Sequence, residues 1–134
     1  MALENKQQVE DFADALSLCA DTIHRRLIKA IKNKEVSRTV AQSIFQDESS
    51  LRQQASGLYI EAANSVVSGL EKSQASILVV VDKAKKKIKT IKAIAQFVDL
   101  IADLLVLATA VYAAKVGPII AALAEVEKDL KTRG

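Results

Sequence analysis

Apolar side chains recur at intervals of three and four over the first thirty residues of the chain. The members of this stripe are Val9, Phe12, Leu16, Cys19, Ile23, Leu27 and Ile31. Because that spacing places all of them on one side of an α-helix, it predicts a helix over residues 3–32 whose apolar side packs against the rest of the protein.

The pattern stops at "KNKEVS" and resumes with Val40, Ile44 and Phe45, which predicts a shorter helix over residues 37–46. Ser50, with Gln53 three residues later, fits a capping box. We therefore expect a turn near "DESS" and a new helix over residues 50–72.

A further apolar stripe begins at Leu51 and, after the polar "EKSQAS", continues past residue 77. It permits one helix of about 65 residues, roughly 95 Å long, or two helices that break near residues 73–76. We expect the break, because serine is a good N-cap, and a helix over residues 76–115. Gly117 and Pro118 predict a helical hairpin that turns there, with its second arm over residues 118–132.

The composition supports an all-α fold. Half of the 134 residues are hydrophobic, with one proline and four glycines, so the turns that a β-protein of this size needs are scarce. The length is that of one domain, residues 1–134. We expect a bundle of four or five helices with long antiparallel members.

Small side chains form seams along the middle helices. They recur every seven residues at Ala55, Ala62, Gly69 and Ser76 and again at Ala95, Ala102 and Thr109. Such seams let helix backbones approach closely. They indicate either a close-packed antiparallel helix pair or simply an alanine-rich helical protein.

Residues 94–114 are the most apolar part of the chain. The segment is long enough to span a bilayer, but Asp99 and Asp103 each cost roughly 2.5–3.5 kcal/mol there, and the uncharged stretch 104–114 measures only about 16 Å. We therefore expect this stretch to be enclosed on nearly all sides by helices of the same chain, by other subunits, or by a cover that releases it into lipid. The predicted core or insertion residues are Phe97, Leu100, Ile101, Leu104, Leu105, Leu107, Val111, Ile119, Ile120 and Leu123.

The two aspartates give the membrane hypothesis a dependence on pH. Protonation of Asp99 and Asp103 removes the main insertion penalty, so any affinity for lipid is expected to rise at acid pH. In a soluble fold, the same carboxylates are expected to form salt bridges with Lys92, Lys115 or another helix.

A lysine run directly precedes this segment. It consists of Lys83, Lys85, Lys86, Lys87, Lys89 and Lys92. Its interpretations are a solvated helix surface, a patch that binds anionic lipid headgroups, and a surface for an acidic protein partner. Nucleic acid is disfavoured, because the run offers no arginine to read bases and no aromatic ring to stack on them.

The sequence contains no recognisable catalytic or metal-binding motif. Cys19 lies on the apolar stripe, which predicts a buried, unreactive thiol, and His24 lies at its edge, which predicts a partly exposed side chain. One cysteine and one histidine do not make a zinc site, and there is no phosphate-binding glycine loop or nucleophile elbow. We expect no enzyme activity, cofactor, metal or small-molecule substrate.

Two classes of function remain. The first is a non-enzymatic interaction or assembly protein that forms a homo-oligomer or binds a protein partner through apolar helix faces. The second is a membrane-active protein that binds anionic lipid through residues 83–92 and conditionally inserts the 97–124 hairpin. The polar start "MALENKQQVEDF" does not resemble a signal peptide, which makes the cytoplasm the default location, with peripheral membrane association or signal-less export as alternatives.

Overall fold

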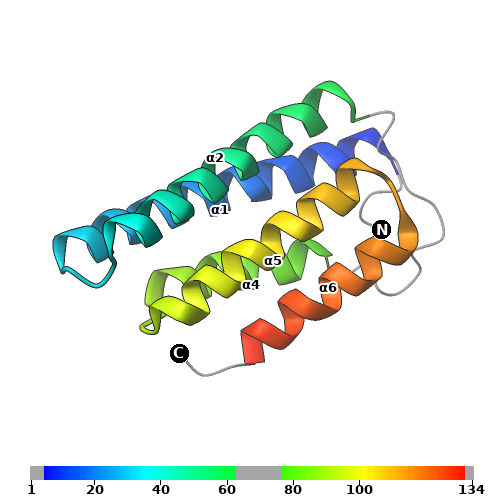
Figure 1. Cartoon of the computed structure of the whole chain (residues 1–134). Helices are drawn as coiled ribbons and strands as arrows, with labels where there is room; N and C mark the ends of the chain where they lie inside the picture. The colour runs from blue at the N-terminus through cyan, green and yellow to red at the C-terminus, as the bar shows by residue number, and fades with distance from the viewer. Residues whose placement is uncertain (1–4, 63–76, 132–134) are drawn as a thin grey trace.

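A computed structural model describes residues 5–62 and 77–131, and over these residues the protein is an all-α bundle without strands (Figure 1). The predicted fold class is therefore confirmed. Its helices are α1 (Lys6–Lys32), α2 (Arg38–Ile60), α4 (Ile77–Thr90), α5 (Ile94–Tyr112) and α6 (Val116–Lys131).

Neighbouring helices of the bundle pack both antiparallel and parallel. α2 runs antiparallel to α1, since Arg52 reaches Asp21 while Tyr59, further along α2, donates to Asp14 near the start of α1. α4 instead runs parallel to α1: the Cys19 thiol meets the carbonyl of Val81, and the side chain of Arg26 meets the backbone ten residues later. α5 packs beside α2, and α6 folds back along α5 (Figure 1).

One continuous core joins all five helices. Its largest fully buried side chains are Phe12, Leu16, Ile23, Ile44, Leu51, Leu58, Ile77, Ile88, Phe97, Leu100 and Ile101. These side chains come from the apolar stripes of α1, α2, α4 and α5, and α6 adds Ile119, Ala122, Leu123 and Val126 to the same cluster. Burial of these stripes supplies most of the free energy that holds helices of this length in place.

The second helix is longer than the sequence predicts. The turn expected near "DESS" is wrong, because α2 continues through it and is capped instead by the Ser37 hydroxyl, which accepts from the backbone of Val40. Glu48 explains why α2 continues through this stretch. Its side chain is buried against α1, where it contacts His24 of α1 and Arg52 of α2 itself. Tertiary contacts of the acidic stretch thus override its local preference for a turn.

The predicted helix over residues 76–115 is also interrupted. α4 ends at Thr90 and α5 begins at Ile94. Ile91 between them is buried, and its carbonyl accepts hydrogen bonds from the Arg26 guanidinium. The break predicted at residues 73–76, and the part of the predicted 50–72 helix beyond residue 62, lie outside the described residues. The alternative of one 65-residue helix is wrong, since α2 ends at Ile60.

The C-terminal hairpin forms, but it turns earlier than Gly117 and Pro118. Ala114 takes a left-handed conformation with φ of 55°, and the N–H of Lys115 donates to the carbonyl of Ala110, which closes the end of α5. Gly117 and Pro118 lie in the first turn of α6, where the missing N–H of proline has no consequence.

Candidate functional site

The predicted apolar residues of α5 and α6 divide between core and surface. Eight of them are buried: Phe97, Leu100, Ile101, Leu104, Leu107, Val111, Ile119 and Leu123. Leu105 is half-buried, and Ile120 on α6 is 41% exposed. The buried members that lie on α5 define its inner face, which contacts α2 and α6.

The opposite face of α5 is open to solvent. Its exposed residues, which we call the α5 seam, are Ala95, Asp99, Ala102, Val106, Thr109 and Ala113. They follow one another at intervals of four and three, which is the spacing of a helix–helix contact. The seam includes one of the small-residue series noted in the sequence. Ala95 and Ala102 of that series are exposed, whereas the Thr109 hydroxyl accepts a hydrogen bond from Gln54 of α2 at 3.4 Å.

The expectation that residues 104–114 are enclosed on nearly all sides is wrong for a single chain. Val106 is 57% exposed and Tyr112 44% exposed. Tyr112 leans over Gly57 of α2, where an added Cβ would lie 2.6 Å from its ring. The described helices thus cover one side of this stretch and leave the other uncovered.

α5 is also the one described helix that is long and apolar enough to cross a membrane by length and composition alone. It has 19 residues, and its most apolar window has a mean hydropathy of 2.0. Only 44% of that window is buried. A core helix of comparable hydropathy in a lone soluble domain is mostly buried. The exposed apolar face of α5 is therefore a candidate interaction surface.

The lysine run lies on the outer side of α4 and just after it. Lys83, Lys86, Lys89 and Lys92 are exposed, whereas Lys85 and Lys87 are half-buried. Asp82 pairs with Lys85 and Lys86, and these contacts lower the pKa of its carboxyl. The Lys87 ammonium donates to the carbonyl of Leu130 at 3.3 Å, which ties α4 to the end of α6. The run is therefore partly structural and partly free to meet a partner.

The two acids of α5 do not pair with lysine as the sequence suggested. No salt bridge of Asp99 or Asp103 occurs within the described residues. Asp99 is exposed, and Asp103 faces Asp129 of α6. Burial, the hydrogen bond with Asp103 and the neighbouring carboxylates raise the pKa of Asp129 to about 7. A pH-sensitive carboxyl thus lies on α6, where sequence reasoning placed none.

Cys19 and His24 lie where the sequence predicts. Cys19 is buried, and burial raises the pKa of its thiol to about 12, so the thiolate needed for reaction does not form near neutral pH. The His24 side chain is 45% exposed, with Nδ1 3.0 Å from Oε1 of Glu48. Together with the bonds from Arg52 to Glu48 and Asp21, this network joins α1 to α2.

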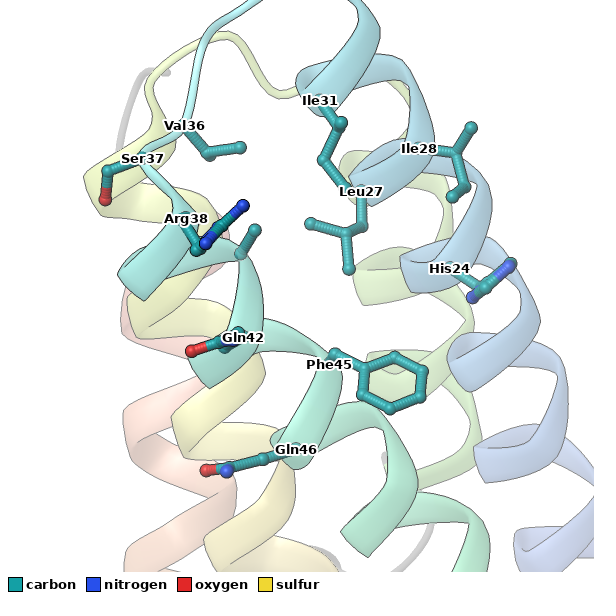
Figure 2. Close-up of a pocket in the computed structure, with 11 residues that line it drawn as sticks. His24, Leu27, Ile28, Ile31, Val36, Ser37, Arg38, Gln42, Phe45 and Gln46 are labelled. Carbon is teal, nitrogen blue, oxygen red and sulfur yellow. The ribbon is translucent and has the colours of Figure 1, made fainter.

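An apolar groove between α1 and α2 was missed by the sequence analysis. It has a volume of about 700 Å³. Figure 2 shows Leu27, Ile31, Val36 and Phe45 pointing into the space between the two helices, with glutamines along the α2 side. Phe45 is 52% exposed there. Its signal was visible in the sequence, because adjacent positions such as Ile44 and Phe45 cannot both face the core of one helix.

A smaller basic hollow lies between α1 and α4. It has a volume of about 140 Å³ and is lined by Thr22, Arg25, Arg26, Lys29 and Lys89. Nothing in the sequence pattern indicated this hollow. The convergence of its α1 residues with Lys89 depends on the parallel packing of α1 and α4, which the pattern along one chain does not reveal.

No group of three or more metal-ligating side chains occurs in residues 5–62 and 77–131. Comparisons with protein-family models, with curated proteins and with solved structures found no match to this chain. Function must therefore be argued from the surfaces themselves, of which the α5 seam is the most distinctive.

Proposed function

We propose that this chain is a non-enzymatic assembly protein that self-associates through the α5 seam, with α5 of one copy packed antiparallel on α5 of a second. The observation that carries the proposal is that the most apolar helix presents an uncovered face of small and apolar side chains with regular four–three spacing. Such a face is self-complementary, as a two-fold interface requires.

The spacing of the seam sets a register for the pair. Consider an antiparallel pair whose two-fold axis passes α5 at the height of residue 104. Ala95 then lies opposite Ala113 of the second copy, and Ala102 lies opposite Val106. Small side chains at these positions let the two backbones approach closely. The Ala95–Ala113 and Ala102–Val106 contacts bury only alanine and valine, so no bulky side chain meets another there.

Charge selects the antiparallel orientation. In a parallel pair in register, Asp99 of one copy would lie opposite Asp99 of the other, and two like carboxylates held close together are unfavourable. In the antiparallel register Asp99 lies opposite Thr109, and the two Asp99 side chains are separated by about 15 Å along the helix axis. The second copy is thus the occupant that fits both the shape and the charge of the seam.

The experiment is a concentration series by size-exclusion chromatography with light scattering, in the absence of detergent. Val106→Lys places a charge inside the proposed interface. Val79→Lys is its matched control, since Val79 is 53% exposed on the outer face of α4 and Val106 is 57% exposed on that of α5. We expect a dimer for the native chain and for Val79→Lys, and a monomer for Val106→Lys.

A native chain that stays monomeric up to about 100 μM would refute self-association, because a dimer with a Kd of about 100 μM or tighter is populated at that concentration. Equal dimerisation of both variants would show that a dimer forms through another surface.

A second candidate function is conditional membrane binding, and the specific observation in its favour is the adjacency of two features. α5 meets the length and hydropathy of a membrane span, and exposed lysines of α4 precede it directly in the chain. Lysine clusters of this size attract anionic headgroups. Asp99 and Asp103 oppose insertion while they are ionised.

Vesicle flotation separates the two functions. Under the membrane hypothesis the native chain floats with vesicles that contain phosphatidylserine, more strongly at pH 5 than at pH 7, and Val106→Lys weakens flotation. Under the assembly hypothesis the dimer ignores vesicles at both pH values. Flotation without any dimer in solution would replace the first proposal by the second.

A further inference from the structure

The basic hollow between α1 and α4 brings four cationic side chains together without an acid among its lining residues. Arg25 and Lys29 lie one turn apart on α1, Lys89 comes from α4, and Arg26 lies at the inner side. Within the described residues, none of Arg25, Lys29 and Lys89 takes part in a salt bridge. Mutual repulsion makes such a cluster unfavourable unless an anion joins it.

Arg26 adds an unfulfilled hydrogen-bonding group. Its side chain is 6% exposed, Nε and Nη2 donate to the Ile91 carbonyl at 3.2 and 3.1 Å, and Nη2 also pairs with Glu35 at 2.8 Å. Nη1, in contrast, is buried and has no hydrogen-bond partner in the part of the chain that the structure describes. A buried donor of this kind carries a free-energy cost that a ligand oxygen would remove.

Thr22 also contributes hydrogen bonds to the lining of the hollow. The Thr22 hydroxyl donates to the carbonyl of Leu18 at 2.9 Å and accepts from Nη2 of Arg25 at 3.5 Å. Arg25, which also lines the hollow, is thereby linked to Thr22. Because Glu35 pairs with Arg26 alone among these cations, a net positive charge remains.

We propose that this hollow binds a phosphate group, held by Arg25, Arg26, Lys29 and Lys89. The hollow of about 140 Å³ offers the space of four to five water molecules at ~30 Å³ each, which suits a group of five heavy atoms. Phosphate supplies several acceptor oxygens and up to two negative charges, and arginine binds it through paired N–H groups.

The phosphate has two sources with the same chemistry. It can be a small soluble phosphate, or the headgroup of an anionic phospholipid. The hollow opens beside the exposed lysines of α4, which would add attraction to a membrane surface. The α5 seam belongs to a different part of the bundle, so this site does not depend on self-association.

Lys89→Gln and Lys83→Gln form a matched pair for the test. Each removes one exposed lysine from α4, but only Lys89 lines the hollow. Binding of inorganic phosphate is measured by titration calorimetry at low salt, and binding of vesicles by flotation with phosphatidylcholine alone or with added phosphatidic acid. Circular dichroism establishes that both variants keep their helix content.

We expect Lys89→Gln to weaken phosphate binding about tenfold, as loss of one charge-assisted hydrogen bond does, and Lys83→Gln to change it less than about twofold. If soluble phosphate binds with this difference, the ligand is a soluble phosphate. If only phosphatidic acid vesicles bind and Lys89→Gln alone releases them, the ligand is a headgroup. Equal weakening by both variants, or no binding of either probe by the native chain, would overturn the proposal.

Discussion

α4 and α5 follow one another in the chain and bury similar stripes, yet their outer faces differ. α4 buries Val81, Ala84 and Ile88 and presents lysines to solvent. α5 buries Leu100, Leu104 and Leu107 and presents mainly alanine, valine and threonine, together with Asp99. One apolar face is all that either helix needs in order to fold, so the second apolar face of α5 is not explained by the folding of one chain.

The difference shows which part of an amphipathic pattern carries functional information. The buried stripe reports only that a helix packs in a core, which α4 and α5 do equally. The uncovered face reports what the helix meets outside the core. The uncovered face of α4 is charged, which predicts contact with an anionic partner. The uncovered face of α5 is mainly apolar, which predicts contact with an apolar surface.

The largest expected effect separates the two faces of α5. Leu104→Ala removes a fully buried side chain, and we expect it to lower the free energy of unfolding by about 2–5 kcal/mol. Val106→Ala on the seam should lower it by less than about 0.5 kcal/mol at concentrations where the chain is monomeric. Urea denaturation of both variants is the measurement, and similar losses would mean that the seam is part of the monomer core.

The next effect concerns the joint between α4 and α5. Arg26→Met keeps most of the side-chain volume but leaves the Ile91 carbonyl without the guanidinium, and we expect a loss of about 2–4 kcal/mol. Arg25→Met, at the exposed neighbouring position, should cost under about 0.5 kcal/mol. Should the two variants unfold at the same urea concentration, Arg26 does not hold the joint.

A smaller effect depends on pH and on the contact of α5 with α6. The pKa of Asp129 is about 7 in the folded chain and near its usual 3.8 when unfolded, so the folded chain binds more protons between these values. Stability from this group is therefore complete below about pH 4 and declines as pH rises through 7. Asp129→Asn should abolish this decline in urea unfolding at pH 5 and pH 8, whereas Glu127→Gln, on the same helix, should keep it.

The smallest effect lies at the end of α5. Ala114 has φ of 55°, a conformation that glycine adopts at less cost, so Ala114→Gly should stabilise the protein by about 0.5–1 kcal/mol. Ala113, with φ of −75°, gains nothing from glycine. Thermal unfolding compares the two variants, and a loss of stability in Ala114→Gly would contradict this account of the turn.

Periodicity along the chain was sufficient for the fold class and for the stripes of α1, α4 and α5, because burial of a stripe is a local, repeating requirement. It failed at the helix ends. The continuation of α2 past Glu48 depends on His24, and the break at Ile91 depends on Arg26. In both cases the decisive partner lies more than twenty residues away, so no pattern within one window of sequence indicates it.

The candidate surfaces were predictable to different degrees. The small-residue series of Ala95, Ala102 and Thr109 was visible in the sequence, but whether it faces inward or outward depends on how α5 rotates against α2 and α6. The basic hollow needs α1 and α4 side by side in the same direction. The groove at Phe45 needed only attention to two adjacent apolar residues.

The buried thiol of Cys19 has a practical consequence for labelling experiments on this protein. With its single thiol buried beneath α4, the native protein offers thiol-directed maleimide or iodoacetamide reagents no reactive group. Val79→Cys, on the exposed face of α4 and outside the α5 seam, would accept a fluorophore or spin label selectively, without first rebuilding the interior. Distances between two such labels would then report the orientation of paired chains directly.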